Sequence, residues 1–258
     1  MCANNGYRND EIQQKNLFQL DRIIVNQNAA KNHTITNVVI SSSPFNLISF
    51  GGFTEIVSPI TTVQTFLFFN ITMSEISAGS SANLIEFSGF TSEAHHMFSF
   101  ALLTFSSVTF STGGTFFDFQ HTSSPLAPLV IANSFFLNNR RGYIKLENSD
   151  LSQQKIAVLT DSVFSSNMQE QEALISVKGN SLMQVLKSTF QNNYSLATGS
   201  VLRAEGIVSF EDSVFMGNYA LKAGVLMVGT QGTVLCNNCT FLSNFAIESA
   251  VFDLNNAN

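Results

Sequence analysis

The stretch Ser188-Thr-Phe190-Gln-Asn-Asn193 represents a motif of the form Ser/Cys-x-Phe-x-x-Asn that recurs along the second half of the chain. Five copies follow one another, and their phenylalanines lie 28, 26, 25 and 26 residues apart. Such regular spacing is typical of a structural repeat with a period of about 25 residues. The repeated positions are Phe136, Phe164, Phe190, Phe215 and Phe241, with Asn139, Asn167, Asn193, Asn218 and Asn244 three residues later.

The first half repeats more loosely. Asn46-Leu-Ile-Ser-Phe50 returns 37 residues later as Asn83-Leu-Ile-Glu-Phe87. The same offset aligns Met73 with Phe110, which precedes Phe136 by 26 residues. The predicted core positions, which we call anchors, are therefore Ile40, Met73, Phe110 and the five phenylalanines above.

Each repeat contains three short apolar stretches, for example Val201–Ala204, Ile207–Phe210 and Ser213–Phe215. They are rich in β-branched or aromatic residues and are separated by Gly, Asn or Asp, which are signals for strands and turns. Three short strands in about 25 residues describe one coil of a parallel β-helix. We therefore expect an all-β, right-handed, single-stranded parallel β-helix of about eight to nine coils with three strands each.

Stacking explains the repeat, because one coil cannot bury its own inner face. The phenylalanines should form an inward aromatic stack, and the asparagines a hydrogen-bonded ladder at a tight turn. A third column of mostly polar residues lies three positions before the anchors. Its members are Asn70, Ser107, Asn133, Asp161, Lys187, Asp212 and Asn238.

The composition excludes several classes of protein. Of 258 residues, 45% are apolar and 25 are phenylalanine, which argues against disorder, and only 12% are charged. A net charge of −6 with a single basic doublet, Arg140-Arg141, argues against nucleic acid as a partner. No apolar run approaches the length of a membrane-spanning helix, and Met1–Leu20 does not resemble a signal peptide.

We expect residues 1–34 to form an N-terminal cap or irregular lead-in segment, with a short helix within Asn9–Leu20. Residues 35–258 should form the β-helix, with regular coils from about residue 128. Ala250–Leu254 begins a new coil with no capping segment after it. That pattern predicts either continuation past Asn258 or end-to-end docking at the C-terminal coil.

The loops that follow the first strand of each coil should crowd one edge, where function is often located. They are long at 51–64, 88–101, 119–128 and 147–154 and short at 178–181, 205–206 and 229–232. A metal or other ligand could be held there by Glu93, His95, His96, Asp118 and His121. Adjacent histidines on a strand point to opposite faces, so polar loop residues facing water are the favoured interpretation, and we expect neither a metal nor a cofactor.

Phe215-Met-Gly-Asn218-Tyr-Ala-Leu-Lys-Ala-Gly224 and Phe190-Gln-Asn-Asn193-Tyr-Ser-Leu-Ala-Thr-Gly199 resemble the FxxN and glycine-rich repeats of polymorphic outer-membrane autotransporters. More broadly, they resemble the right-handed β-helix of pectin-lyase-like proteins. The resemblance covers roughly residues 35–254 and is strongest from about 128. The family's double glycine is reduced here to Gly199, Gly224 or Ser249-Ala250. The resemblance implies a fold and a surface-exposed location rather than an activity.

Polysaccharide-cleaving enzymes that resemble this fold use Asp clusters with Arg or Lys on one face. Asp161 and Asp212 should lie two coils apart, about 9–10 Å, with Lys187 between them. This separation would suit an inverting glycosidase. However, the rest of the column is mostly Asn and Ser, which favours a structural role for the three residues.

Cys236-Asn-Asn-Cys239 lacks two further ligands at the spacing of a zinc site, so we interpret it as a structural thiol pair or a local disulfide. Four Asn-x-Ser/Thr sequons begin at Asn32, Asn70, Asn193 and Asn238. Asn193, within the expected ladder, should be a poor glycan acceptor.

The leading functional hypothesis is a non-catalytic β-helix segment of a cell-surface or secreted protein, serving as a stalk, an adhesin or a glycan-contacting surface. Its expected partners are carbohydrate or another protein surface. The alternative is a polysaccharide lyase or glycoside hydrolase that uses Asp161, Lys187 and Asp212. A third possibility is that this chain is a piece of a longer one whose function lies elsewhere.

Overall fold

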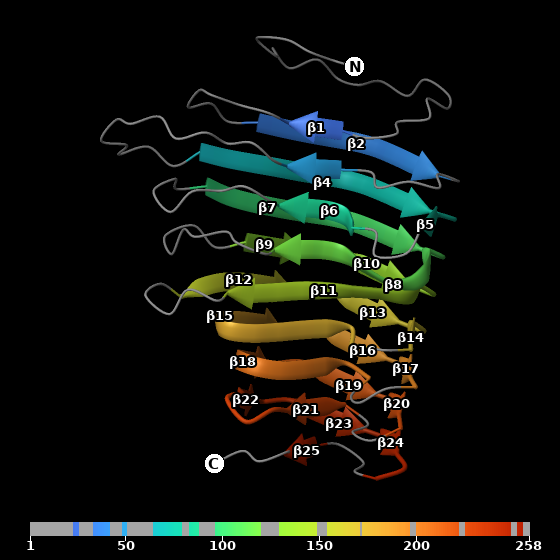
Figure 1. The fold of residues 1–258 in the computed structure, drawn as a ribbon, viewed down its shortest axis with the longest axis vertical. Coiled ribbons are helices and arrows are strands. Elements are labelled where there is room, and N and C mark those ends of the chain that lie inside the picture. Colours follow the sequence, from blue (N-terminus) through green and yellow to red (C-terminus); the bar gives the residue numbers. More distant parts are fainter. Residues whose placement is uncertain are drawn as a thin grey trace.

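A computed structural model describes residues 23–25, 33–41, 48–50, 64–78, 83–87, 96–119, 129–148, 154–170, 172–196, 200–221, 225–248 and 252–254. Within these ranges all regular structure is β, and 25 strands form one parallel sheet that winds into a solenoid (Figure 1). The prediction of an all-β parallel helix is confirmed. The expected capping helix within 9–20 lies outside the described residues.

Each full turn has four strand segments, which we call sides 1 to 4 in chain order. Side 1 consists of β9 (Leu129–Ala132), β12 (Lys155–Thr160), the second halves of β15 (Ile175–Leu186) and β18 (Leu202–Glu211), and β22 (Thr233–Asn237). Side 2 consists of β10 (Phe135–Leu137), β13 (Val163–Ser165), β16 (Thr189–Gln191), β19 (Val214–Met216) and β23 (Thr240–Leu242).

Side 3 consists of the start of β11 (Arg140–Asn148), then β14 (Met168–Gln169), β17 (Tyr194–Ser195), β20 (Tyr219–Ala220) and β24 (Phe245–Ala246). Side 4 consists of the rest of β11, the first halves of β15 and β18, β21 (Leu226–Val228) and β25 (Phe252–Leu254). Earlier rows are formed by β1 (Ile23–Val25), β2 (His33–Ser41), β3 (Ile48–Phe50), β4 (Gln64–Ser74), β5 (Ser77–Ala78), β6 (Asn83–Phe87), β7 (His96–Ser106) and β8 (Thr109–Phe119).

The coil count differs from the eight to nine coils expected. About five full turns run from Leu129 to Leu254, and each has four strand segments rather than three. Side 3 escaped detection because its strands, such as Tyr219–Ala220, are only two residues long. The rows of β2, β4 and β7 stack in register before these turns, but their anchors lie 33, 32 and 31 residues apart rather than 25.

The predicted anchor Phe110 is wrong. Met73 pairs with Phe105, which in turn pairs with Phe136. Phe110 instead belongs to β8 and pairs with Ala78. The 37-residue offset is real on side 4, where Ile48 pairs with Ile85. It does not extend to Met73 because the connections between side 4 and side 1 differ in length from row to row.

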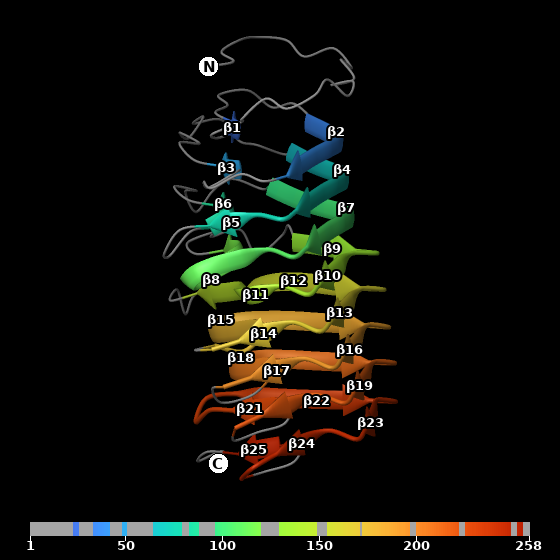
Figure 2. The same cartoon turned by 90° about the vertical axis from the view of Figure 1, so that its right-hand side faces the viewer.

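The interior of side 2 is a continuous stack of phenylalanine rings. Successive centroids from Phe105 to Phe241 lie 5.0, 4.3, 5.0, 5.1 and 4.7 Å apart, with planes within 17° of parallel. Phe136, Phe164, Phe190 and Phe215 are fully buried, whereas Phe241 is half-buried because no further side 2 strand covers it in the described chain. Figure 2 shows the corresponding strands, β10 to β23, directly above one another.

The predicted asparagine ladder is confirmed. The Asn193 backbone N–H and Nδ2 both donate to Asn218 Oδ1, at 3.1 and 2.9 Å, and Nδ2 also donates to the Phe164 carbonyl at 3.1 Å. The same pattern links all five asparagines. At its N-terminal end, the ladder closes on the backbone N–H of Val108, which donates to Asn139 Oδ1.

A second ladder, which sequence analysis missed, is made of serine hydroxyls two residues before the phenylalanines. Each hydroxyl donates to the carbonyl two residues earlier and accepts the N–H of the preceding turn, as Ser188 does from Ser162 at 3.2 Å. The buried serines are Ser134, Ser162, Ser188 and Ser213. Cys239 occupies the same position in the last turn, where its thiol lies 3.5 Å from the Asn237 carbonyl.

Two bends per turn hold left-handed residues, with φ between 47° and 63°. The first bend separates sides 1 and 2 and contains Asn37, Asn70, Leu102, Asn133, Asp161, Lys187, Asp212 and Asn238. The second separates sides 2 and 3, from Glu75 to Ser243, and includes Ser107. Ser107 was therefore assigned to the wrong column, as a consequence of the misplaced Phe110. Asn and Asp suit these bends because they tolerate the left-handed region better than most residues.

Candidate functional site

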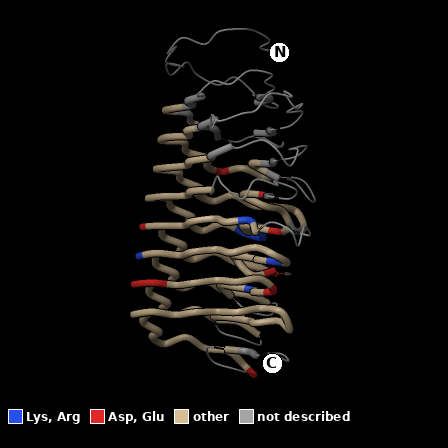
Figure 3. Tube along the Cα trace, turned by 90° about the vertical axis from the view of Figure 1, so that its left-hand side faces the viewer, with Lys and Arg blue, Asp and Glu red and all other residues tan. Residues whose placement is uncertain are grey.

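Charged residues in the described part of the chain gather on the middle turns (Figure 3). Most lie on sides 3 and 4, on strands β8, β11, β15 and β18 and the turn after β14. Because these strands are in register, residues of opposite charge come to lie beside one another. The group consists of Asp118, Arg140, Arg141, Lys145, Glu147, Glu170, Glu172, Lys178, Arg203 and Glu205.

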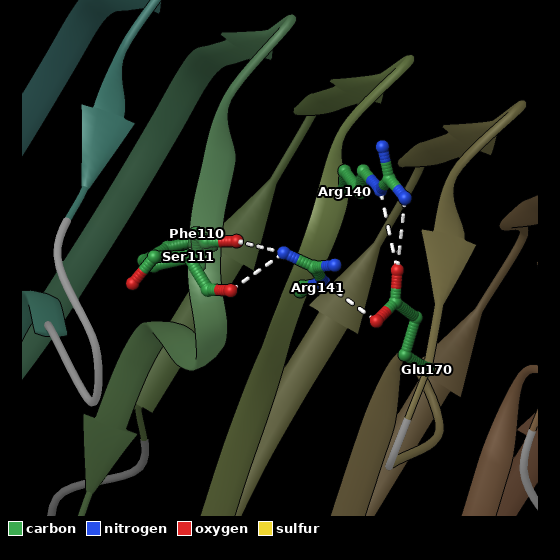
Figure 4. Close-up of polar contacts among 5 residues, drawn as sticks. All are labelled: Phe110, Ser111, Arg140, Arg141 and Glu170. Atoms are coloured by element: carbon green, nitrogen blue, oxygen red, sulfur yellow. Dashed lines mark hydrogen bonds and ion pairs between the residues drawn. The ribbon is translucent and has the colours of Figure 1, made fainter.

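The most highly connected part of this group lies at the corner between sides 3 and 4 (Figure 4). Glu170 Oε1 accepts from Arg140 Nη2 at 3.0 Å, and Glu170 Oε2 lies 2.8 Å from Arg141 Nε. Arg141 Nη1 also donates to the Ser111 carbonyl at 2.6 Å and the Phe110 carbonyl at 3.3 Å. These contacts link three successive rows. The hydrogen bond from Arg141 lowers the pKa of Glu170, so this carboxylate stays ionised.

A small pocket of about 160 Å³ opens beside this cluster. It forms where the chain leaves the sheet after β14, while β8 and β11 run around the corner without interruption. Its volume is below the range typical of sites for drug-sized ligands. The pocket is lined by Ser111, Thr112, Arg141, Tyr143, Gln169, Glu170 and Glu172.

The lining offers hydrogen bonds but little unbalanced charge. Arg203 Nη1 lies 3.6 Å from Glu172 Oε2, and Arg203 Nη2 lies 2.7 Å from Glu205 Oε1. Burial, assisted by Glu172, raises the pKa of Tyr143 to about 12, so its hydroxyl remains a donor at neutral pH. The pocket therefore suits a small polar molecule better than a strongly charged one.

Side 4 continues the charge alternation. Asp118 pairs in register with Lys145, and Glu147 with Lys178, which in turn pairs with Glu205. Apart from the buried Asp118, these residues are partly exposed, and pairs of that kind contribute little stability individually. Opposite charges nevertheless lie side by side on adjacent turns only when the strands pair as they do here. They therefore favour this pairing over one in which a strand is displaced relative to its neighbour. We therefore interpret most of this charge as structural.

Lys155 is an exception because it is buried, with 5% of its surface exposed. Its Nζ donates to the Glu147 carbonyl at 2.6 Å. Burial lowers the pKa of Lys155 to about 8, against the opposing influence of Asp118 and Glu147. A fraction of this amine is thus neutral under mildly alkaline conditions.

The residues proposed for the enzyme alternative do lie in one column. Asp161, Lys187 and Asp212 occupy the first bend of three successive turns, and all three are exposed. Asp161 Oδ2 accepts from Thr160 Oγ1 at 2.6 Å, and Asp212 Oδ1 accepts from Asn238 Nδ2 at 2.5 Å. Among the described residues, no ion pair joins Lys187 to either carboxylate.

Most of the loop residues proposed as ligands lie outside the described part of the chain. Glu93, His95 and His121 lie outside the described residues, and His96 is the first residue of β7. The expected loop 88–101 therefore ends earlier than predicted. Asp118 is on β8 and is buried at 7% exposure. Within the described ranges, no three His, Cys, Asp or Glu side chains are placed to hold a metal ion.

Cys236 and Cys239 are both free thiols. Cys236 pairs in register with the buried Phe210 but is exposed, because no described strand covers side 1 beyond it, whereas Cys239 continues the serine ladder and is half-buried. Loss of hydration, together with the neighbouring Cys239, raises the pKa of Cys236 to about 12. A reactive redox cysteine has a lowered pKa, and the raised pKa of Cys236 does not fit that role.

The last three turns carry an exposed apolar surface on sides 2 and 3, which we call the apolar grid. On the preceding turn the matching positions are Ser165, Met168 and Glu170. Eight of its nine outward residues are apolar or aromatic, and Phe245 and Ile247 are 57% and 62% exposed. The grid consists of Gln191, Met216, Leu242, Tyr194, Tyr219, Phe245, Leu196, Leu221 and Ile247.

The aromatic column of this grid presents ring edges rather than faces. Tyr194 stacks on Tyr219 at 4.8 Å, and Tyr219 on Phe245 at 5.5 Å. The faces between neighbouring rings are therefore covered, so the column is not a platform on which sugars could stack. A contiguous apolar surface of this kind is typical of protein contact sites.

Sequence analysis missed both the corner cluster and the apolar grid. In the sequence Arg140-Arg141 is only a basic doublet, and its partner Glu170 occupies a position at which the later turns carry Leu196, Leu221 and Ile247, so no repeated charge marks it. The sequence does contain a pattern from which the grid could have been predicted, because an aromatic residue directly follows a ladder asparagine in three turns, at Tyr194, Tyr219 and Phe245.

Comparisons with known proteins give one partial similarity. No protein-family model matches the chain, and no solved structure matches it. Metabotropic glutamate receptor-like protein Q of Dictyostelium discoideum is 30% identical over 73 residues, which is 28% of this chain and 6% of that protein. The chain thus matches only a small part of the receptor-like protein. No helix in the described ranges is long and apolar enough to cross a membrane.

Proposed function

We propose that this chain is a non-catalytic β-helix segment of a cell-surface or secreted protein, in which it acts as a rigid spacer with an adhesive face. The observation that carries this proposal is that the polar side chains of the regular turns bond mainly to equivalent positions in the next turn. The asparagine and serine ladders use their amides and hydroxyls in this way. Side chains committed to the stack serve architecture rather than turnover.

Two surface features support the adhesive part of the proposal. The apolar grid offers a contact surface for another protein. The corner pocket, with Tyr143, Glu172 and backbone carbonyls, offers donors and acceptors for the hydroxyls of a sugar. Protein surfaces and glycans are therefore the two partner classes that we propose.

Two comparisons are consistent with an extracellular location. The repeat pattern resembles that of pectin-lyase-like and autotransporter β-helices, and we propose a relationship to that group. The partial similarity to a receptor-like protein of Dictyostelium discoideum supports a role within a larger surface protein.

The enzyme alternative remains testable because Asp161, Lys187 and Asp212 are exposed on three successive turns. Against it, a side chain of a neighbouring residue or turn already donates to each carboxylate. Both residues also lie exposed at the first bend, whereas catalytic groups are usually enclosed in a cleft.

The deciding experiment measures turnover and binding with the purified full chain. A panel of neutral and acidic polysaccharides is assayed for bond cleavage by the wild type, Asp212→Asn and the matched control Glu211→Gln on the same row. We expect no cleavage by any of the three. Cleavage that is lost in Asp212→Asn and retained in Glu211→Gln would overturn the proposal.

Binding is measured separately on a glycan array and on intact cells. We expect Tyr143→Phe and Glu172→Gln to weaken glycan binding, and Leu221→Lys to weaken attachment to protein-coated surfaces. Wild-type protein that binds neither kind of surface would contradict the adhesive role while leaving the spacer role standing.

A further inference from the structure

Two of the four sequon asparagines lie at equivalent, solvent-facing positions. Asn70 and Asn238 both occupy the first bend, with φ of 54° and 51°, and both are exposed. Asn70 Nδ2 donates to Asn37 Oδ1 at 2.8 Å, and Asn238 Nδ2 donates to Asp212 Oδ1. Only one amide hydrogen of each is engaged in these contacts, which lie at the surface.

Asn193 is different in every respect that matters to an acceptor. It is 1% exposed, and both Nδ2 hydrogens are used, toward the Phe164 carbonyl and Asn218 Oδ1. Its sequon hydroxyl residue, Ser195, is also fully buried. A glycan at Asn193 would break both contacts and would need an opening through the stacked turns. Asn32 lies outside the described residues.

We propose that Asn70 and Asn238 are N-glycan acceptors and that a glycan at Asn193 is incompatible with the folded chain, so that folded, secreted protein carries none there. This inference rests on the proposed function in one respect, since the modification requires entry into a secretory pathway. The glycosyl donor is a lipid-linked oligosaccharide diphosphate. The asparagine Nδ2 forms a bond to the anomeric carbon of the sugar, and the bond from that carbon to the diphosphate oxygen breaks. The amide proton passes to a base of the transferase, and the lipid diphosphate leaves.

The two sites share one edge of the solenoid. The first-bend residues between Asn70 and Asn238 are Leu102, Asn133, Asp161, Lys187 and Asp212. The two acceptors are thus six rows apart, about 29 Å at the usual strand spacing. Glycans at both ends of this column would flank Asp161, Lys187 and Asp212, which would keep large molecules from that edge. The side 3 surface, with the apolar grid and the corner pocket, would stay uncovered.

The test directs the full chain into the secretory pathway of eukaryotic cells behind a cleavable signal. Folded monomer is isolated from the medium and treated with an amidase that removes N-glycans in heavy-oxygen water. Each occupied asparagine is thereby converted into a labelled aspartate, which is read by peptide mass spectrometry. We expect label at Asn70 and Asn238 and none at Asn193.

Variants make the assignment specific. Thr72→Val and Thr240→Val destroy a sequon without touching the asparagine, and each should remove one glycan from the intact mass. Ser195→Ala should leave the mass of the glycan complement unchanged.

Label at Asn193 in folded monomer, or an absence of label at both Asn70 and Asn238, would overturn the inference. A synthetic peptide spanning residues 189–197 serves as the control, because it should be modified by the same membranes when the fold is absent. The location of the unaltered protein in its native cells is measured independently. Its absence from the secretory pathway would refute the proposed function, whereas forced entry still tests the choice of acceptor.

Discussion

The rings of Phe136 and Phe164 are stacked at 4.3 Å with their planes 3° apart, although the two residues are 28 positions apart in the chain. The backbone pairing of β10 with β13 places them directly opposite each other. Stacked side chains and parallel strands thus enforce the same register. The loss of unfolding free energy when one ring is removed should therefore depend on where that ring lies along the stack.

Removing a ring from the middle of the stack should be more costly than removing one from its end. Phe190→Ala should lower the free energy of unfolding by about 3–5 kcal/mol, because it leaves a cavity between two buried rings. Phe241→Ala should cost less, since Phe241 is already half-exposed. Urea unfolding followed by circular dichroism measures both, and equal losses would contradict an energetic role for stacking.

The asparagine ladder should be similarly sensitive. Asn193→Ala removes four side-chain hydrogen bonds and leaves the Phe164 carbonyl without its donor, so we expect a loss of about 2–4 kcal/mol. The control Asn237→Ala, at an exposed position of β22, should change stability by less than about 0.5 kcal/mol. If Asn193→Ala left the free energy of unfolding unchanged, the ladder would be a by-product of the register of the turns and not a source of stability.

Stability should rise with pH above about 8 because of Lys155. Its folded-state pKa is about 8 and its ordinary value is 10.5, so between these limits the unfolded chain binds more protons. The slope is at most about 1.4 kcal/mol per pH unit. Above about pH 9 the raised pKa of Cys236 acts in the opposite direction, and above about pH 10 so does the raised pKa of Tyr143, since the unfolded thiol and phenol ionise first. Urea unfolding at half-unit intervals from pH 7 to 9 therefore measures the rise.

Two variants identify the source of that rise. Lys155→Met should abolish it, whereas Lys178→Met, which removes a partly exposed amine on the neighbouring strand β15, should preserve it. A rise that persists in Lys155→Met would assign the titration to another group.

Gly142 should tolerate no side chain. A Cβ there would lie 2.5 Å from Phe110 Cε2 and 2.6 Å from Phe116 Cζ, and both rings are fully buried. Gly142→Ala should therefore lower the free energy of unfolding by about 1–3 kcal/mol. Gly229→Ala is the comparison, because its closest neighbour is the flexible side chain of Glu205, and its cost should be smaller. Thermal unfolding of the two variants in the same buffer measures both losses, and a loss in Gly142→Ala no larger than that in Gly229→Ala would contradict the prediction.

The fold was predictable from sequence because the stack repeats one chemical environment at one spacing. Phe190 and Asn193 recur since every turn presents the same interior to the next. Phe105 was missed because its row is longer, and a spacing taken from side 4 does not apply to side 2.

The candidate site was far less predictable. The contact between Arg141 and Glu170 depends on a corner where β11 continues and the next turn leaves the sheet. Among the described strands of the five full turns, only β11 continues around this corner, so it leaves no periodic signal. Residues that recur at a fixed spacing reveal the fold, whereas a contact made in one turn only, such as that of Arg141 with Glu170, becomes visible in the three-dimensional structure.

The ladder's direction also has a consequence for how the protein is made. The Asn193 backbone N–H and Nδ2 donate to Asn218, which leaves the ribosome 25 residues later. At about 5–20 residues per second, that delay is roughly one to five seconds, far longer than local strand pairing requires. During synthesis the newest turn thus always presents donors whose acceptor has not yet been made. The last turn made at any moment therefore exposes unpaired hydrogen-bond donors, and its hydrogen bonds are completed only when the following turn has been synthesised.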